Sequence, residues 1–283
     1  MHNGTDELQS NKLVIVAGYG KLPFLAAQGA KSAGVSVCIL GIRDQASEKL
    51  TDLADKFYWI PIARIGKWIK LARKFGATEL ILAGGVKKTE AFSPWRIWKY
   101  LPDLKTLKIW FKKAKSDRRN LALLSALADE IEQAGIEVIN SVKYCQDILA
   151  DEGLFTHTKP DKSASEDIEF AWPIALKIAE MDVGQAIAVR EKDIIAVEAI
   201  EGTDEMIKRA GTLAKGKWIL LKVAQPHQDM RFDVPTVGPN TIENLHANGA
   251  VALVIQAGKT IMIDKEKMIK LADKYKIAII GKK

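Results

Sequence analysis

The sequence has few of the residues that build disulfide frameworks and metal centres. It contains only two cysteines, Cys38 and Cys145, and four histidines with no ligand spacing between them. Cys38 sits in an apolar run that is typical of a buried strand. Neither a disulfide scaffold nor a zinc site is therefore expected.

Long apolar runs are also missing. No window approaches the roughly 18 apolar residues of a transmembrane helix. Residues 1–11 are polar and lack the apolar centre of a signal peptide. We therefore expect a cytoplasmic protein. No Walker lysine motif is present either.

The chain is long and apolar enough for two domains with their own cores, because it has 283 residues and is 48% hydrophobic. Its formal net charge of +7 comes from 42 basic against 35 acidic residues. The excess is confined to residues 92–119, where lysines and arginines far outnumber Asp103 and Asp117. The rest of the chain is close to neutral.

In the first half, short apolar runs alternate with segments of helical spacing. The pattern predicts strands at 13–17, 35–40, 80–83 and 136–140, and helices at 22–33, 67–75 and 121–134. Strands that alternate with helices in this way indicate a parallel sheet with helices on its faces.

The second half has a different pattern of apolar and polar residues. Residues 151–167 are predicted to be irregular, and a helix is predicted at 167–181. Hairpins are predicted for 186–190 with 194–198 and for 251–255 with 260–263. Further helices are expected at 203–210 (Thr203 as N-cap), 241–248 and 264–275, and further strands at 217–223 and 277–280. We therefore predict an α/β fold, with a parallel-sheet domain at 1–142 (a basic and aromatic insertion at 91–119) and a mixed α+β domain at 143–283.

Glycine turns follow two of the predicted strands. Gly18 and Gly20 flank Tyr19 after the first strand, and Gly84 and Gly85 follow the strand at 80–83. In an open α/β sheet such turns fall along one ligand-bearing edge, where backbone N–H groups can approach a phosphate. A tight structural turn explains the first pair equally well.

The basic segment interleaves its cations with aromatic residues, including Trp95, Trp98 and Trp110. One interpretation is a pair of amphipathic surface helices docked on the sheet. Two functional interpretations compete with it. Aromatic and basic side chains suit a membrane interface, and they also suit stacked bases and phosphates of a nucleic acid.

The strongest functional signal is the polar stretch 222–238. Pro226 and Pro235 exclude a regular helix, so it is predicted to be a loop that leaves a strand. It gathers groups that can neutralise phosphate or activate water, namely Lys222, Gln228, Asp229, Arg231, Asp233 and Thr236.

A second polar motif lies upstream. Glu198, Glu201 and Asp204 surround a strand end and a helix start, where carboxylates can hold magnesium or orient water. Capping of the helix by Thr203 and Asp204 is the simpler alternative.

Five pieces of the sequence together resemble a known family. They are residues 16–23, 82–86, 181–185, 197–204 and 222–238, and they carry the resemblance from about Lys12 to Gly281. The pieces at 197–204 and 222–238 are the specific ones. The family they resemble is the LpxI-type UDP-2,3-diacylglucosamine pyrophosphatases of bacterial lipid A synthesis.

The resemblance implies a Rossmann-like N-terminal domain and magnesium-dependent attack of water on the α-phosphorus, which gives UMP and 2,3-diacylglucosamine 1-phosphate. It also implies a lipid-linked UDP-sugar as substrate, no nucleic acid, peripheral contact with the inner membrane from the cytoplasm, and a homodimer. Membrane contact thereby becomes the leading functional interpretation of the basic segment.

The resemblance and the polar stretches together assign the expected site. Catalytic roles fall to Asp233, with Arg231 and Lys222 neutralising phosphates. Metal-ligand candidates are Glu198, Glu201, Asp204 and Asp229. Substrate-binding candidates are Gly18, Gly20, Lys21, Gly84, Gly85, Val86, Gln185, Gly202, Thr203, Gln228 and Thr236.

Two positions depart from the family pattern: Gln225 stands where a lysine is usual, and residues 119–121 read Arg-Asn-Leu where a G-D-D-like run is usual.

Other interpretations remain open. A dinucleotide-dependent oxidoreductase is suggested by Gly18 and Gly20, but Pro23 and Gly41 stand where that motif expects a glycine and an acidic residue. A non-catalytic membrane or nucleic-acid binding module would leave the polar second half unexplained.

Overall fold

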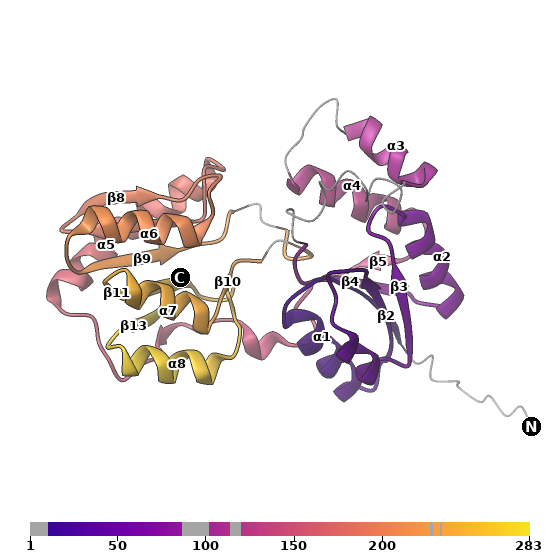
Figure 1. Ribbon diagram of the computed structural model, residues 1–283, viewed down its shortest axis with the longest axis horizontal. Coiled ribbons are helices and arrows are strands. Elements are labelled where there is room, and N and C mark those ends of the chain that lie inside the picture. Colours follow the sequence, from indigo (N-terminus) through magenta and orange to yellow (C-terminus); the bar gives the residue numbers. More distant parts are fainter. Residues whose placement is uncertain (1–10, 87–101, 114–119, 227–228, 233) are drawn as a thin grey trace, which may run out of the picture. The chain divides into compact units, whose positions relative to one another are not determined.

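The computed structural model describes residues 11–86, 102–113, 120–226, 229–232 and 234–283 (Figure 1). The chain forms two compact units. The first unit spans residues 1–146 together with Met230–Phe232, and the second spans Asp147–Asp229 and Asp233–Lys283. None of the helices that the structure describes is long and apolar enough to span a bilayer.

The first unit is built on a five-stranded parallel sheet in the order β3-β2-β1-β4-β5. Its strands are β1 (Lys12–Ala17), β2 (Ser36–Ile42), β3 (Lys56–Ile60), β4 (Glu79–Ala83) and β5 (Glu137–Val138). Its helices are α1 (Leu22–Ser32), the 3-10 helix η1 (Glu48–Leu53), α2 (Ile65–Phe75), α3 (Leu104–Lys113) and α4 (Asn120–Glu132). The order reverses between β1 and β4, which makes their carboxyl ends the switch point of the sheet.

Both faces of this sheet are buried because successive residues of a strand point to opposite sides. Leu13 and Ile15 of β1 pack against α1, whereas Val14 and Val16 pack against α2 and α4. This explains why β1 is apolar without interruption from Leu13 to Ala17 and confirms the predicted parallel sheet with helices on both faces.

Strand β3, which lies at the edge of the sheet, is not among the strands predicted from the sequence. Its aromatic residues are only half-buried. Phe57 and Trp59 meet edge to face, with ring centroids 4.9 Å apart, over Gly41. A Cβ on Gly41 would lie 2.7 Å from the Phe57 ring, so packing accounts for this glycine.

The described part of the basic segment is a docked helix, α3. Asp103 accepts hydrogen bonds from the Thr106 backbone (2.9 Å) and from the Gly66 backbone (2.7 Å), which ties the start of α3 to α2. Lys105 pairs with Glu130 of α4 at 2.8 Å. Leu104 nevertheless remains 85% exposed.

The second unit is built on a six-stranded mixed sheet in the order β6-β13-β11-β9-β7-β8. Its strands are β6 (Gly153–Leu154), β7 (Ala186–Arg190), β8 (Asp193–Val197), β9 (Trp218–Lys222), β11 (Ala250–Gln256) and β13 (Ala278–Lys282), and a small separate pair joins β10 (Thr236–Val237) to β12 (Ile261–Met262). Its helices are η4 (Gln146–Ile148), which begins at the boundary, α5 (Lys162–Glu180), α6 (Thr203–Ala214), α7 (Pro239–Ala247) and α8 (Lys265–Lys274).

Helices cover both faces of this sheet as well. Ala171, Trp172 and Ala175 of α5 pack on one face, and the buried residues of α6, α7 and α8 share a cluster on the other. The α/β class predicted for the chain is confirmed, with a parallel sheet in the first unit and a mixed sheet in the second.

Three local predictions for the second half are wrong. The segments 251–255 and 260–263 do not form a hairpin, because β11 is a central strand between β9 and β13 while β12 pairs with β10. Helix α5 begins at Lys162, five residues before the predicted start at 167, because the Asp161 side chain accepts a hydrogen bond from the Ala164 backbone. The N-cap of α6 is Gly202 with φ of 84°, so Thr203 is the first helical residue instead.

Candidate functional site

In the first unit the two glycine turns lie side by side at the switch point. The Gly18 N–H donates to the Ala83 carbonyl at 2.8 Å. Tyr19 and Gly85 then exchange backbone hydrogen bonds in both directions, at 2.9 and 3.0 Å, as an isolated antiparallel bridge. The two turns therefore form one double loop above the carboxyl ends of β1 and β4.

Three of the predicted glycines are needed for this double loop to close. A Cβ on Gly18 would lie 2.2 Å from the Gly85 carbonyl oxygen, and one on Gly84 would lie 2.4 Å from the Tyr19 carbonyl oxygen. A Cβ on Gly85 would meet the Tyr19 ring at 2.6 Å. Gly20 faces open space, but its φ of 103° favours glycine. Substrate contact by these glycines stays a prediction.

The double loop presents an exposed rim. Tyr19 and Val86 are each 43% exposed, and Lys21 is exposed at the N-cap of α1, whose first turn carries no acidic residue. A lysine beside a helix N-terminus attracts anions, because the helix dipole adds to its charge. Tyr19 was not among the predicted site residues, although its place between two glycines at a strand end was a usable signal.

In the second unit four predicted residues come together. Lys222 is the last residue of β9, and its Nζ donates to the Thr203 Oγ1 at 3.1 Å and to the Thr236 carbonyl oxygen at 3.3 Å. Thr203 Oγ1 lies 2.8 Å from Glu198 Oε1. The other carboxylate oxygen, Glu198 Oε2, is buried and has no hydrogen-bond partner in the part of the chain that the structure describes. The result is a polar cluster where β8, α6, β9 and β10 begin or end.

The remaining metal-ligand candidates do not join this cluster as a cage. Arg209 donates a hydrogen bond to Glu201 and thereby lowers the pKa of that carboxyl below its usual value. Asp204 accepts from Asn244 at 2.9 Å. Within the described ranges, no three acidic, histidine or cysteine side chains gather as they would around a metal ion. The metal-ligand roles of Glu198, Glu201, Asp204 and Asp229 therefore stay a prediction.

The predicted catalytic loop is divided between the units. Arg231 pairs with Glu132 of α4 at 2.7 Å, and Phe232 packs against the core of the first unit. The Met230 carbonyl oxygen accepts hydrogen bonds from the Ser141 backbone and hydroxyl, at 3.1 and 3.2 Å. Asp229 is half-buried in the second unit. Asp233 and Gln228 lie outside the described residues.

Two further positions acquire structural roles. Gln225, which departs from the family pattern, donates a hydrogen bond from its amide to Asp182. The Gln185 carbonyl oxygen accepts from the Val223 backbone at 2.9 Å and so fixes the start of the loop. Arg119 lies outside the described residues, and Asn120 and Leu121 open α4.

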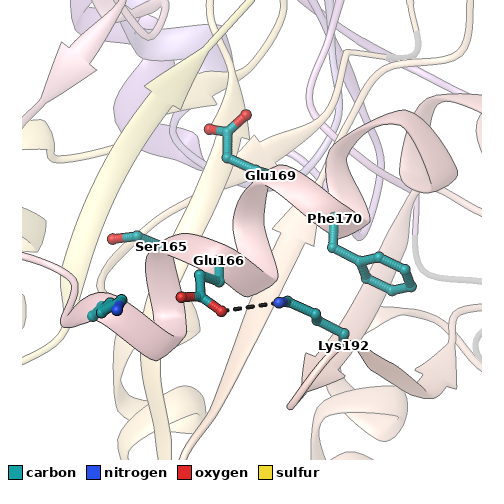
Figure 2. A pocket seen from close by; sticks show the side chains of 6 residues that line it. Ser165, Glu166, Glu169, Phe170 and Lys192 are labelled. Atoms are coloured by element: carbon teal, nitrogen blue, oxygen red, sulfur yellow. Dashed lines mark hydrogen bonds and ion pairs between the residues drawn. The ribbon is translucent and has the colours of Figure 1, made fainter.

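A separate surface hollow of about 590 Å³ lies on α5. Figure 2 shows the Glu166–Lys192 ion pair (2.9 Å) beside the Phe170 ring in this hollow. Lys162, Ser165 and Glu169 complete its lining. None of these residues belongs to the predicted site.

The fold and the polar clusters define the chain as a two-unit α/β protein with a Rossmann-like first unit. Two family models then cover almost all of it, the LpxI N-terminal domain over residues 12–148 and the LpxI C-terminal domain over residues 151–280. The chain belongs to the LpxI family, which confirms the resemblance inferred from its motifs.

A curated relative supports the same assignment. The UDP-2,3-diacylglucosamine pyrophosphatase LpxI of Caulobacter vibrioides is 30% identical over 281 residues, which cover 95% of this chain and 97% of the relative.

Among solved structures, the biotin carboxylase subunit of pyruvate carboxylase is 14% identical with a TM-score of 0.29, covering 73% of this chain and 42% of that one. The biotin carboxylase domain of a thermophilic 2-oxoglutarate carboxylase is 13% identical with a TM-score of 0.28, covering 72% and 33%. The chain thus spans less than half the length of either structure.

Proposed function

We propose that the chain hydrolyses the pyrophosphate bond of UDP-2,3-diacylglucosamine in lipid A synthesis. The observation that carries the proposal is the match to both LpxI domain models together with full-length similarity to the Caulobacter enzyme. Each unit by itself also offers positive charge of the kind that a phosphate group requires, at Lys21 in the first and at Lys222 in the second.

The proposed reaction is attack of water on the α-phosphorus. Asp233 accepts a proton from the water as its oxygen bonds to phosphorus. The bridging P–O bond breaks, and 2,3-diacylglucosamine 1-phosphate leaves with the bridging oxygen. Lys222 neutralises charge on the phosphates, and Arg231 is proposed to do the same. Magnesium is proposed as a requirement on the strength of the resemblance.

Isotopic water tests the reaction and its direction. In H₂¹⁸O with magnesium, the label is expected in UMP and not in the sugar phosphate, because the water oxygen stays on the attacked phosphorus. Mass spectrometry of both products measures this. Chelation of magnesium by EDTA, followed by restoration with excess MgCl₂, provides the matched control. Label in the sugar phosphate would exclude α-attack, and absence of turnover would exclude the proposed function.

Membrane contact through residues 91–119 and a homodimer belong to the same proposal. A substrate with two acyl chains resides in a membrane, and Leu104 of α3 is exposed beside lysines. Trp95 and Trp98 lie outside the described residues, as does the side chain of Trp110.

Sedimentation with vesicles tests this contact. Vesicles containing phosphatidylglycerol are expected to bind the protein, and replacing Trp95, Trp98 and Trp110 by serine should lower the bound fraction several-fold, because rings anchor at headgroup depth. Pure phosphatidylcholine vesicles serve as the charge control. Equal binding by the triple variant and the wild type would rule out this segment as the anchor.

A further inference from the structure

The Lys222 ammonium is held by residues outside its own strand. It donates hydrogen bonds to the hydroxyl of Thr203, the first residue of α6, and to the carbonyl of Thr236, the first residue of β10, among its contacts. A lysine side chain is flexible, and its ammonium has three donors that can rotate. Two acceptors from different elements therefore fix where this charge lies.

The direction of the hydrogen bonds can be worked out. A threonine hydroxyl has one hydrogen and can also accept. Lys222 can only donate and an ionised Glu198 can only accept, so the Thr203 hydroxyl accepts from Lys222 and donates to Glu198 Oε1. The hydroxyl thus links the ammonium to the carboxylate in one chain, and losing any member changes the geometry of the others.

Glu198 is itself fixed by its surroundings. Its backbone N–H donates to the Ala186 carbonyl at 2.8 Å. Gly184 lies so close that a Cβ there would be 1.9 Å from the Glu198 carbonyl oxygen. Among the described residues, Glu198 Oε2 is buried without a hydrogen-bond partner, which is costly for a carboxylate.

Helix capping does not explain Thr203. The N-cap of α6 is Gly202, and the helix start has no side-chain capping hydrogen bond. The hydroxyl is committed to Lys222 and Glu198 instead. These contacts therefore indicate that Thr203 serves to position the Lys222 ammonium.

We propose that Thr203 and Glu198 are positioning residues, which hold the Lys222 ammonium in place for a phosphate oxygen of the substrate. This inference rests on the proposed function and adds to it. It also gives Glu198, predicted as a metal ligand, a different task, and gives Thr203 an indirect contribution to substrate binding.

A double-mutant cycle tests the proposal. Thr203→Val keeps the shape but removes the link, and kcat/KM for UDP-2,3-diacylglucosamine is expected to fall about 10- to 100-fold, since small misplacements of a reacting group carry costs of this size. Thr203→Ser is expected to recover most of that loss. In a Lys222→Ala background Thr203→Val should cause no further loss, because the group it positions is gone. Thr212→Val is the matched control and should match the wild type, because among the described residues the exposed Thr212 hydroxyl of the same helix donates only to the Lys208 backbone carbonyl oxygen at 3.1 Å.

Glu198→Gln separates positioning from metal binding. In the double variant, the decrease in kcat/KM caused by Glu198→Gln should not add to the decrease caused by Thr203→Val. The magnesium concentration that gives half-maximal rate should stay that of the wild type. A raised magnesium requirement would assign Glu198 to the metal and overturn the proposal. An unimpaired Thr203→Val, or an undiminished effect in the Lys222→Ala background, would overturn it while leaving the proposed function intact. A wild-type chain that releases no UMP would overturn both.

Discussion

Replacing Asp233 by asparagine is expected to lower kcat for UDP-2,3-diacylglucosamine hydrolysis about 100- to 10,000-fold, the usual contribution of a general base. Asparagine has nearly the same shape but cannot accept the proton of the attacking water. KM should change little, because the substitution acts on the transition state more than on substrate binding. Release of UMP at saturating magnesium measures both constants.

Asp229→Asn is the control for that experiment, because it makes the same change in the same loop. Asp229 is a metal-ligand candidate and not the proposed base, so at saturating magnesium its loss should stay within about tenfold, well below the range of a general base. Equal losses in the two variants, or an Asp233→Asn enzyme with near-normal turnover, would remove Asp233 from the role of base.

Substitution of Gly18 by alanine is expected to destabilise the first unit by about 3 kcal/mol. The new Cβ would lie 2.2 Å from the Gly85 carbonyl oxygen. Both atoms are tied to backbone that already forms the Tyr19–Gly85 bridge, so neither can move without breaking hydrogen bonds. Urea unfolding followed by circular dichroism measures the loss, and activity should fall with it because the rim at Lys21 shifts.

Gly238→Ala serves as the comparison. Its Cβ would meet the nearest atom at 3.5 Å, an ordinary contact, and its φ of −164° is extended backbone that any residue adopts. It should cost less than about 1 kcal/mol. If both variants unfold at the same urea concentration, the double loop does not depend on the close approach at Gly18.

The sequence predicted those strands and helices whose pattern of apolar residues matches their burial in the folded protein. After their charged first residues, Lys12 and Glu79, β1 and β4 are apolar because both faces are buried, and each predicted strand agrees with the observed one to within one residue at either end. β3 was missed because its aromatic residues are half-buried at an edge. The false hairpin arose because β11 and β12 are adjacent in sequence, whereas pairing of β11 with β9 and β13 depends on contacts across the whole unit.

For the candidate site, too, residue types were predictable from the sequence and side-chain contacts were not. Residue type and position at element ends were enough to select Lys222, Thr203, Glu198 and Thr236, which the fold brings together. The sequence could not show that a hydroxyl links the lysine to the glutamate, since that depends on side-chain geometry. Nor could it show that Arg231 pairs with Glu132, because the two are 99 positions apart.

Membership of Met230–Phe232 in the first unit affects how the protein is made. As the chain leaves the ribosome, residues 1–146 lack these last contacts until Phe232 has emerged. At that moment β9 has also emerged, but its neighbour β11 and the more distant β13 have not yet left the ribosome. Domains generally fold as units during synthesis, so the first unit can be complete before the centre of the second sheet exists. A ribosome stalled just after Phe232 has emerged would therefore carry a complete first unit and a β9 that has β7 beside it but lacks β11 on its other side.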